Sequence, residues 1–150
     1  MKALTVWQPW ASLIVLGLKP YEFRPWAYKP NMVGTRVAIH AGARRVPARE
    51  FSTLKLLILR GAGPRMGLTG DVDDFFIALQ DQCANLTHGA VSGFATLGEP
   101  VPSSATGFRP DSNRPEKSGF GWPMLDPKPL DIPEDARGQQ GFWNWGGTEP

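Results

Sequence analysis

The sequence predicts an α+β fold, in which a small β-barrel of about five to six strands has two to three helices packed beside it. Short segments rich in β-branched and aromatic residues are separated by turn residues along the chain. Two or three segments with apolar residues at helical spacing lie among them. The strands are dispersed and do not alternate regularly with helices, which favours α+β over a doubly wound sheet. A chain of 150 residues suits a single domain over residues 1–150.

The N-terminal part predicts a strand, a short helix and a second strand. Residues 4–7 are rich in β-branched and aromatic side chains, which is typical of a strand. A helix is expected over residues 9–17, with proline in its first turn and glycine at its end. In residues 20–25, aromatic and charged side chains then alternate. The aromatic side chains are therefore expected on one face of a strand, and Glu22 and Arg24 on the other.

A strand and two further helices are expected in the middle of the chain. In the strand over residues 34–42, Val37 and Ile39 should point inward. The opposite face should carry Arg36, Ala38 and His40. One helix is expected from Pro47 to Gly61, and another begins at Asp71. Their apolar stripes comprise Phe51, Leu54, Leu57 and Ile58 in the first, and Val72, Phe75, Phe76, Leu79 and Cys83 in the second.

The last third of the chain predicts strands interrupted by a long loop. Residues 89–99 are typical of a strand, with a bulge or a close backbone approach at Gly93. Residues 102–119 are polar, contain Pro and Gly and have no periodicity, so we expect a mobile loop. Closing strands are expected at 120–125 and 141–145, around a proline-rich connector at 123–133, and the prolines favour edge or irregular strands.

Composition limits the classes of protein to consider. A lone cysteine, Cys83, excludes an internal disulfide framework and is typical of a reducing compartment. The longest apolar run is too short to span a bilayer, and the start has no signal-peptide core, so we expect a cytoplasmic protein with no membrane contact. Residues 1–70 carry a net charge of +9 and residues 71–150 one of −7. The basic half suits a polyanion or a phosphate-bearing ligand, unless the two halves neutralise each other across the fold.

The stretch QPWASLIVLGLKPYEFRPW, residues 8–26, contains the candidate functional site. Lys19, Glu22 and Arg24 follow the first predicted helix directly and are surrounded by aromatic residues. Charges in such surroundings are partly desolvated, which makes their pairing consequential and their pKa values adjustable. The alternative is an ordinary surface pair of Glu22 with Arg24, which contributes about 0–1 kcal/mol.

This stretch, with VAIHAG at 37–42 and RGQQGFWNW at 137–145, resembles the ASCH (activating signal cointegrator homology) family. The family pattern after the first helix is Gly-x-Lys-x-x-Glu-x-Arg, which is matched here by Gly17, Lys19, Glu22 and Arg24. The resemblance spans most of the chain. It implies a PUA-like β-barrel, with a cleft between barrel and first helix that is lined by the motif. It also implies RNA binding, ribonuclease activity, or an amidohydrolase activity that removes the acyl group from 4-N-acetylcytidine.

Our leading interpretation is hydrolysis of a 4-N-acylated cytosine nucleoside without a cofactor. In that reading Lys19 attacks the amide carbonyl or activates the attacking group, Glu22 moves a proton, and Arg24 or a backbone amide holds the oxyanion. In the similar amidohydrolases a Thr stands where this chain has Glu22, and a later Glu takes part. Glu99 is the candidate for that later carboxylate, with Glu116 behind it. The candidate substrate-binding residues are Trp7, Trp10, Ser12, Arg24, Trp26, Arg36 and His40.

The second interpretation is binding of single-stranded RNA, with or without cleavage. Exposed indoles stack unpaired bases, and a basic track binds phosphates. That track would comprise Arg36, His40, Arg44, Arg45 and Arg49, unless the last three are a solvated helix start. No metal site is expected. The aspartates in residues 71–74 suit the N-terminus of a helix better than a divalent cation, and His40 with His88 gives no ligand spacing. The oligomeric state is not predicted.

Overall fold

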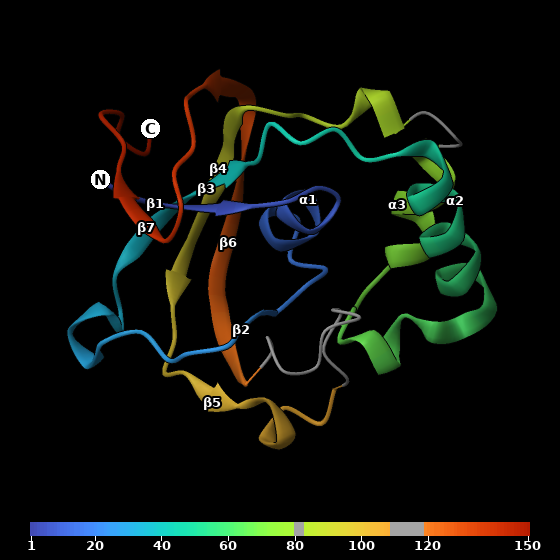
Figure 1. The fold of residues 1–150 in the computed structure, drawn as a ribbon, viewed down its shortest axis with the longest axis horizontal. Helices are drawn as coiled ribbons and strands as arrows, with labels where there is room; N and C mark the ends of the chain where they lie inside the picture. The colour runs from blue at the N-terminus through green and yellow to red at the C-terminus, as the bar shows by residue number, and fades with distance from the viewer. Residues whose placement is uncertain (80–82, 109–118) are drawn as a thin grey trace.

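The computed structural model describes residues 1–79, 83–108 and 119–150, and it confirms the α+β class (Figure 1). The helices are α1 (Trp10–Val15), α2 (Ala48–Leu57) and α3 (Val72–Leu79). The strands are β1 (Lys2–Val6), β2 (Tyr21–Arg24), β3 (Arg36–Ala41), β4 (Ala90–Leu97), β5 (Val101–Pro102), β6 (Phe120–Asp135) and β7 (Phe142–Asn144). No helix in the described ranges is both long enough and apolar enough to cross a membrane.

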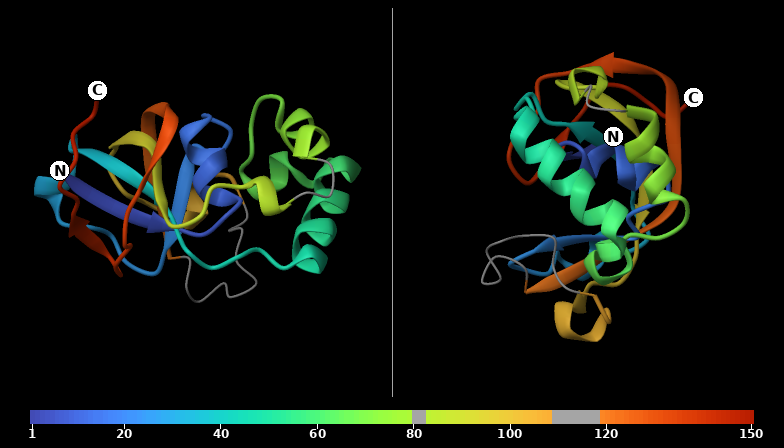
Figure 2. Two further views of the ribbon diagram at one scale, coloured as in Figure 1. Left: turned by 90° about the horizontal axis from the view of Figure 1, so that it is seen from above. Right: turned by 90° about the vertical axis from the view of Figure 1, so that its right-hand side faces the viewer.

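The strands form one curled sheet, a half-barrel, with the order β2-β6-β4-β3-β1-β7 and with β5 paired to β6. It therefore has seven strands where the sequence predicted five to six. β1 and β3 run parallel, with Thr5 opposite His40, and the other pairs are antiparallel. α1 lies within the curl, and α2 and α3 lie at the end of the molecule away from both termini (Figures 1 and 2). The two ends of the chain are joined by the amide of Trp145, which donates to the carbonyl of Met1 at 2.8 Å.

Apolar side chains form three buried clusters, and these explain why both faces of β3 are covered. One cluster fills the space between α1 and the sheet and includes Val37 and Ile39. A second holds α2 and α3 to the rest of the fold. The third lies on the outer face of the sheet, where Trp143 and Trp145 pack over Ala38. The predicted division of β3 is confirmed, since Val37 and Ile39 lie in the first cluster while Ala38 and His40 lie on the opposite face, and that second face is buried as well because the C-terminal segment covers it.

The proline-rich connector expected at 123–133 is wrong, because these residues belong to the 16-residue strand β6. β2 pairs only with residues 120–123 of β6, so beyond that point β6 pairs with β4 alone among the described strands. A strand with a free edge tolerates proline, which lacks an N–H. The irregularity expected at Gly93 is confirmed. The register between β4 and β6 shifts there, and a Cβ on Gly93 would lie 2.9 Å from the Cα of Pro129.

The structure also differs from the sequence predictions in smaller details of the helices and of the loop at 102–119. α2 continues into a π-helical turn at Ile58–Ala62, and Leu57 is exposed, so it is not part of the apolar stripe. Cys83 falls in a separate 3-10 turn, Cys83–Asn85, and not in α3. The expected mobile loop at 102–119 begins with the end of β5 and a 3-10 turn at Ser103–Ala105. Residues 109–118 lie outside the described residues.

Candidate functional site

The end of α1 and the start of β2 bring the charged motif together. Gly17 has a φ of +75°, the left-handed conformation that favours glycine, and it turns the chain out of the helix. The amides of Leu18 and Lys19 both donate to the carbonyl of Leu13, which fixes the position of Lys19 directly after the turn. Two residues later β2 begins, and it pairs with β6 so that Glu22 lies opposite Trp122.

Lys19 is buried, with 1% of its surface exposed. Its Nζ donates to the carbonyl of Tyr21 at 2.5 Å and to Oε2 of Glu22 at 3.2 Å. The rings of Trp10 and Phe23 lie 5.8 Å and 5.3 Å from Nζ, within the range of cation–π attraction. The protein thus holds a cation between two aromatic rings and balances it with a carboxylate.

Glu22 joins this lysine to Arg24. Arg24 Nε lies 3.0 Å from Oε1 of Glu22, while Nη2 donates to the carbonyl of Thr5 at 3.0 Å. The Nε–H is buried and is directed at no hydrogen-bond acceptor among the described residues, so its contact with Glu22 is an ion pair and not a directed hydrogen bond. Buried donors are nearly always paired, so this N–H is open to an acceptor from a ligand.

Two tryptophans extend the motif on the side of Arg24. The guanidinium of Arg24 lies 5.8 Å from the ring of Trp122, and Trp122 donates through Nε1 to the carbonyl of Trp26 at 2.8 Å. The Trp26 ring meets Trp122 edge-on and is 49% exposed. The structure therefore brings together five of the predicted site residues, with Trp26 as the accessible indole: Lys19, Glu22, Arg24, Trp10 and Trp26.

Four predicted substrate-binding residues have structural partners elsewhere. Ser12 Oγ accepts from Gln8 Nε2 at 2.9 Å, and the Ser12 amide donates to the same Gln8 side chain at 3.1 Å. His40 is 1% exposed and donates through Nε2 to the carbonyl of Ala136, and burial lowers its pKa although this hydrogen bond opposes the shift. Arg36 is paired with Glu149. Trp7 is 59% exposed and lies under the guanidinium of Arg44.

The later carboxylate remains a prediction. Glu99 is exposed, two residues beyond the end of β4. Glu116 lies outside the described residues. Trp122, Phe23 and the Thr5 carbonyl were not predicted as site residues. Phe23 could have been found, since it lies on the motif strand, whereas the contact of Trp122 depends on pairing between segments about 100 residues apart.

A cavity of about 470 Å³ lies away from this motif, between the end of α2 and the start of α3. Ile58, Leu68 and Asp71 are among the residues that line it. Thr69, one of the lining residues, is hydrogen-bonded to the segment that precedes Lys19: its amide donates to the carbonyl of Leu18 at 2.9 Å. The cleft at Lys19 that the resemblance implies remains a prediction. Lys19 itself is buried, and the rings of Trp10 and Phe23 lie 5.8 Å and 5.3 Å from its Nζ. In the described ranges, no group of three or more His, Cys, Asp or Glu side chains is placed to hold a metal ion.

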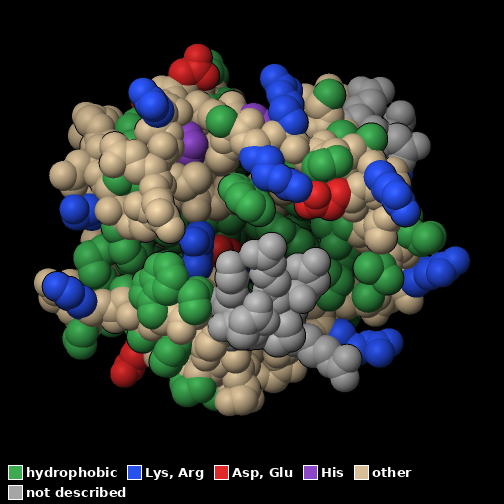
Figure 3. Space-filling view, viewed as in Figure 1, with side chains coloured by type: hydrophobic (Ala, Val, Ile, Leu, Met, Phe, Trp, Pro, Cys, Tyr) green, Lys and Arg blue, Asp and Glu red, His purple; other side chains and the backbone are tan. Residues whose placement is uncertain are grey.

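Two residues of the expected phosphate track are paired with carboxylates. Arg44 pairs with Glu50, Nη2 to Oε2 at 2.6 Å, and Arg36 pairs with Glu149. Figure 3 shows Lys and Arg side chains dispersed over one face, several of them beside acidic groups, around a hollow lined by hydrophobic side chains. Arg45 and Arg49 are exposed near α2, where they remain candidates for phosphate contacts.

No family model matches the chain, and no curated protein matches it. Among solved structures, a crystal structure of ASCH from Zymomonas mobilis aligns with a TM-score of 0.47 at 16% identity, covering 89% of this chain and 72% of that chain. Two structures of single-residue variants of the Zymomonas mobilis protein align with TM-scores of 0.48 at 18% identity. They cover 89% of this chain and 74% and 72% of theirs. These structures carry the same domain name that the sequence resemblance suggested.

Proposed function

We propose that this chain is an amidohydrolase that removes the acyl group from a 4-N-acylated cytosine nucleoside at Lys19, Glu22 and Arg24. The observation that supports it is the buried Nε–H of Arg24, which lacks an acceptor among the described residues and lies beside the Lys19–Glu22 pair. An acyl carbonyl oxygen is an acceptor of the required kind. Bound there, its carbonyl would be polarised and the developing oxyanion would be stabilised by a preorganised cation.

The contacts of Lys19 and Glu22 suit the proton transfers of amide hydrolysis. Glu22 takes a proton from water as the water oxygen attacks the acyl carbon. Lys19 donates a proton to the exocyclic nitrogen of cytosine as the C–N bond breaks, and the carboxylic acid and the free nucleoside leave. The proton on Glu22 then passes to Lys19 across their 3.2 Å contact, which restores both groups.

In this proposal one tryptophan binds the base and a second controls access to the lysine. Trp26, with its exposed indole, is the stacking surface for the pyrimidine, a contact worth about 1–3 kcal/mol in nucleic-acid sites. Trp10 is half-buried over the Nζ of Lys19, so its ring is the one that a substrate displaces to reach the lysine.

The test is ultraviolet-monitored turnover of 4-N-acetylcytidine by the wild type and by Lys19→Met, each with and without a chelator. The proposal predicts turnover by the wild type that survives the chelator and is lost in the variant. Arg44→Gln is the matched control, because it removes a cation that pairs with an exposed glutamate, and it should keep full activity. A folded wild-type protein that does not turn over the substrate would refute the proposal.

One observation favours single-stranded RNA binding as the second candidate function. Trp7 is 59% exposed, and the guanidinium of Arg44 lies 4.8 Å from its ring, so an aromatic surface and a cation lie side by side. Such a surface stacks bases with little sequence preference. RNA binding would weaken steeply with salt and would fall in Trp7→Ala, whereas nucleoside hydrolysis would show neither effect. Ribonuclease activity belongs to this second candidate.

A further inference from the structure

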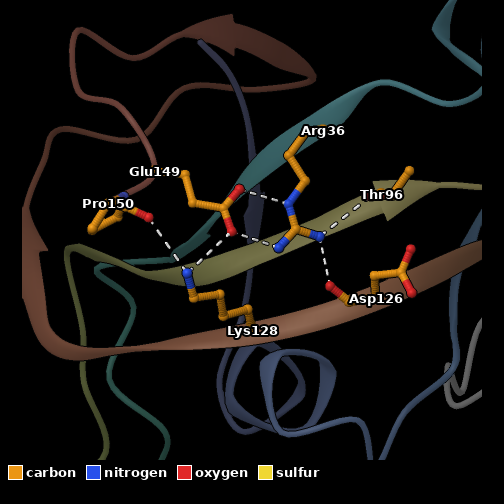
Figure 4. Close-up of polar contacts among 6 residues, drawn as sticks. All are labelled: Arg36, Thr96, Asp126, Lys128, Glu149 and Pro150. Carbon is orange, nitrogen blue, oxygen red and sulfur yellow. Dashed lines mark hydrogen bonds and ion pairs between the residues drawn. The ribbon is translucent and has the colours of Figure 1, made fainter.

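The C-terminal segment reaches back across the sheet to a fixed arginine. Trp145 is buried and is hydrogen-bonded to Met1 in both directions, so the chain is anchored up to that residue. Gly146 and Gly147 follow, and then Glu149 lies against Arg36 at the start of β3 (Figure 4). Among the described residues, the polar side-chain contacts of 146–150 are those of Glu149 with Arg36 and Lys128, and that of Lys128 with the carbonyl of Pro150.

The guanidinium of Arg36 is held by the sheet independently of Glu149. Its Nη1 donates to Oγ1 of Thr96 at 3.3 Å and to the carbonyl of Asp126 at 2.5 Å. Its Cζ lies 6.0 Å from the ring centre of Phe94, so the aromatic ring supports its face. These contacts come from β4 and β6 and fix the orientation of the group.

The opposite edge of the same guanidinium faces the C-terminal segment. Nε donates to Oε2 of Glu149 at 2.8 Å and Nη2 donates to Oε1 at 2.7 Å, which is the two-point geometry that arginine forms with carboxylates and phosphates. Lys128 Nζ lies 3.7 Å from Oε1 and adds a second cation. Arg36 lowers the pKa of the Glu149 carboxyl, mainly through this hydrogen bond, so the carboxyl is held in its anionic form.

We propose that Arg36 and Lys128 form a binding site for a phosphate-bearing ligand, and that Glu149 fills this site from within the same chain. The site is separate from the Lys19 motif and does not rest on the proposed hydrolysis. Phosphate presents two oxygens to the fixed Nε–Nη2 edge, as Glu149 does, and its second negative charge suits Lys128. Release of residues 146–150 at Gly146 and Gly147 opens the site.

The glycine linker explains why a free anion competes weakly. A short flexible linker presents its attached group at an effective concentration of about millimolar. Glu149 therefore weakens the apparent phosphate affinity of the wild type by about the ratio of this effective concentration to the dissociation constant of the carboxylate, whereas a chain without the carboxylate binds at the intrinsic affinity of the site. Removing the Glu149 charge is therefore expected to strengthen phosphate binding by about tenfold or more.

The experiment is a titration of inorganic phosphate followed by the Nε–Hε resonance of Arg36, which is assigned by its loss in Arg36→Lys. We expect saturable shifts in Glu149→Ala and Glu149→Gln at phosphate concentrations at least tenfold lower than in the wild type, and weaker shifts with acetate. The Glu149→Gln variant keeps the segment's shape without its charge, and Glu50→Gln is the control, which should match the wild type. The proposal is overturned if the Arg36 resonance of both Glu149 variants does not saturate with phosphate, or if the wild type saturates at the same concentration.

Discussion

Glu22→Gln removes the carboxylate that Lys19 and Arg24 share, and it is expected to destabilise the fold strongly. Lys19 is 1% exposed and Glu22 is 8% exposed, so solvent does little to screen the loss. The variant leaves an ammonium and a guanidinium around a neutral amide. Removing one partner of a buried ion pair costs about 3–5 kcal/mol. With an m value of about 1.5 kcal/mol/M, the midpoint of urea unfolding should fall by about 2–3 M.

The assay is urea unfolding at pH 7 followed by the fluorescence of the six tryptophans. Glu50→Gln makes the same chemical change at the exposed pair with Arg44, whose side chains are 36% and 51% exposed, and should cost about 0–1 kcal/mol. The double variant Lys19→Met with Glu22→Leu should recover part of the lost stability, because it removes the buried ammonium together with the carboxylate, while Arg24 still loses its ion pair. The reasoning is refuted if Glu22→Gln costs no more than Glu50→Gln.

Three further predictions concern other parts of the fold. Gly93→Ala should lower the free energy of unfolding by about 1–3 kcal/mol in the same urea assay, because the new Cβ meets the backbone of β6. Gly146→Ala is the control and should have little effect, because the space around Gly146 is open. Glu149 has a lowered pKa beside Arg36, so the stability difference between wild type and Glu149→Gln should be complete above the usual value of 4.5 and should vanish as the pH falls through the lowered pKa. A difference that persists in acid would contradict this. Burial raises the pKa of Tyr28 to about 12, so Tyr28→Phe should remove the phase of tyrosine ionisation near pH 12 from an absorbance titration at about 295 nm. If Tyr28→Phe instead removes a phase near pH 10, the phenol is not shielded from solvent.

Local patterns in the sequence predicted the motif, because its geometry is local. Lys19 and Glu22 are three residues apart and directly follow the glycine turn at Gly17, and Glu22 and Arg24 share one face of a strand. Period-two alternation is visible in a single sequence. The close backbone approach at Gly93 was predicted for a similar reason, since a glycine inside a strand pattern indicates crowding.

Contacts between distant segments were not predictable in this way. Trp122 meets Arg24 because β2 pairs with β6, and Glu149 meets Arg36 because the segment after β7 crosses the sheet. The burial of His40 was not predictable for the same reason. Alternation along β3 indicates which side chains share a face, but it does not show that Trp143 covers the second face. Pairing register and coverage are tertiary properties, and a single sequence does not encode them as a local period.

The central claim is that the Nε–H of Arg24, which donates to no hydrogen-bond acceptor among the described residues, is the donor for the substrate's acyl carbonyl. The most direct measurement is the Nε–Hε resonance of Arg24 in Glu22→Gln, a variant that cannot use Glu22 as the base, during titration with 4-N-acetylcytidine. If urea unfolding shows that variant to be too unstable, the wild type at low temperature takes its place. The account predicts a saturable downfield shift of the Arg24 resonance while that of Arg36 stays unchanged. An Arg24 resonance that does not move at concentrations that saturate binding would contradict it.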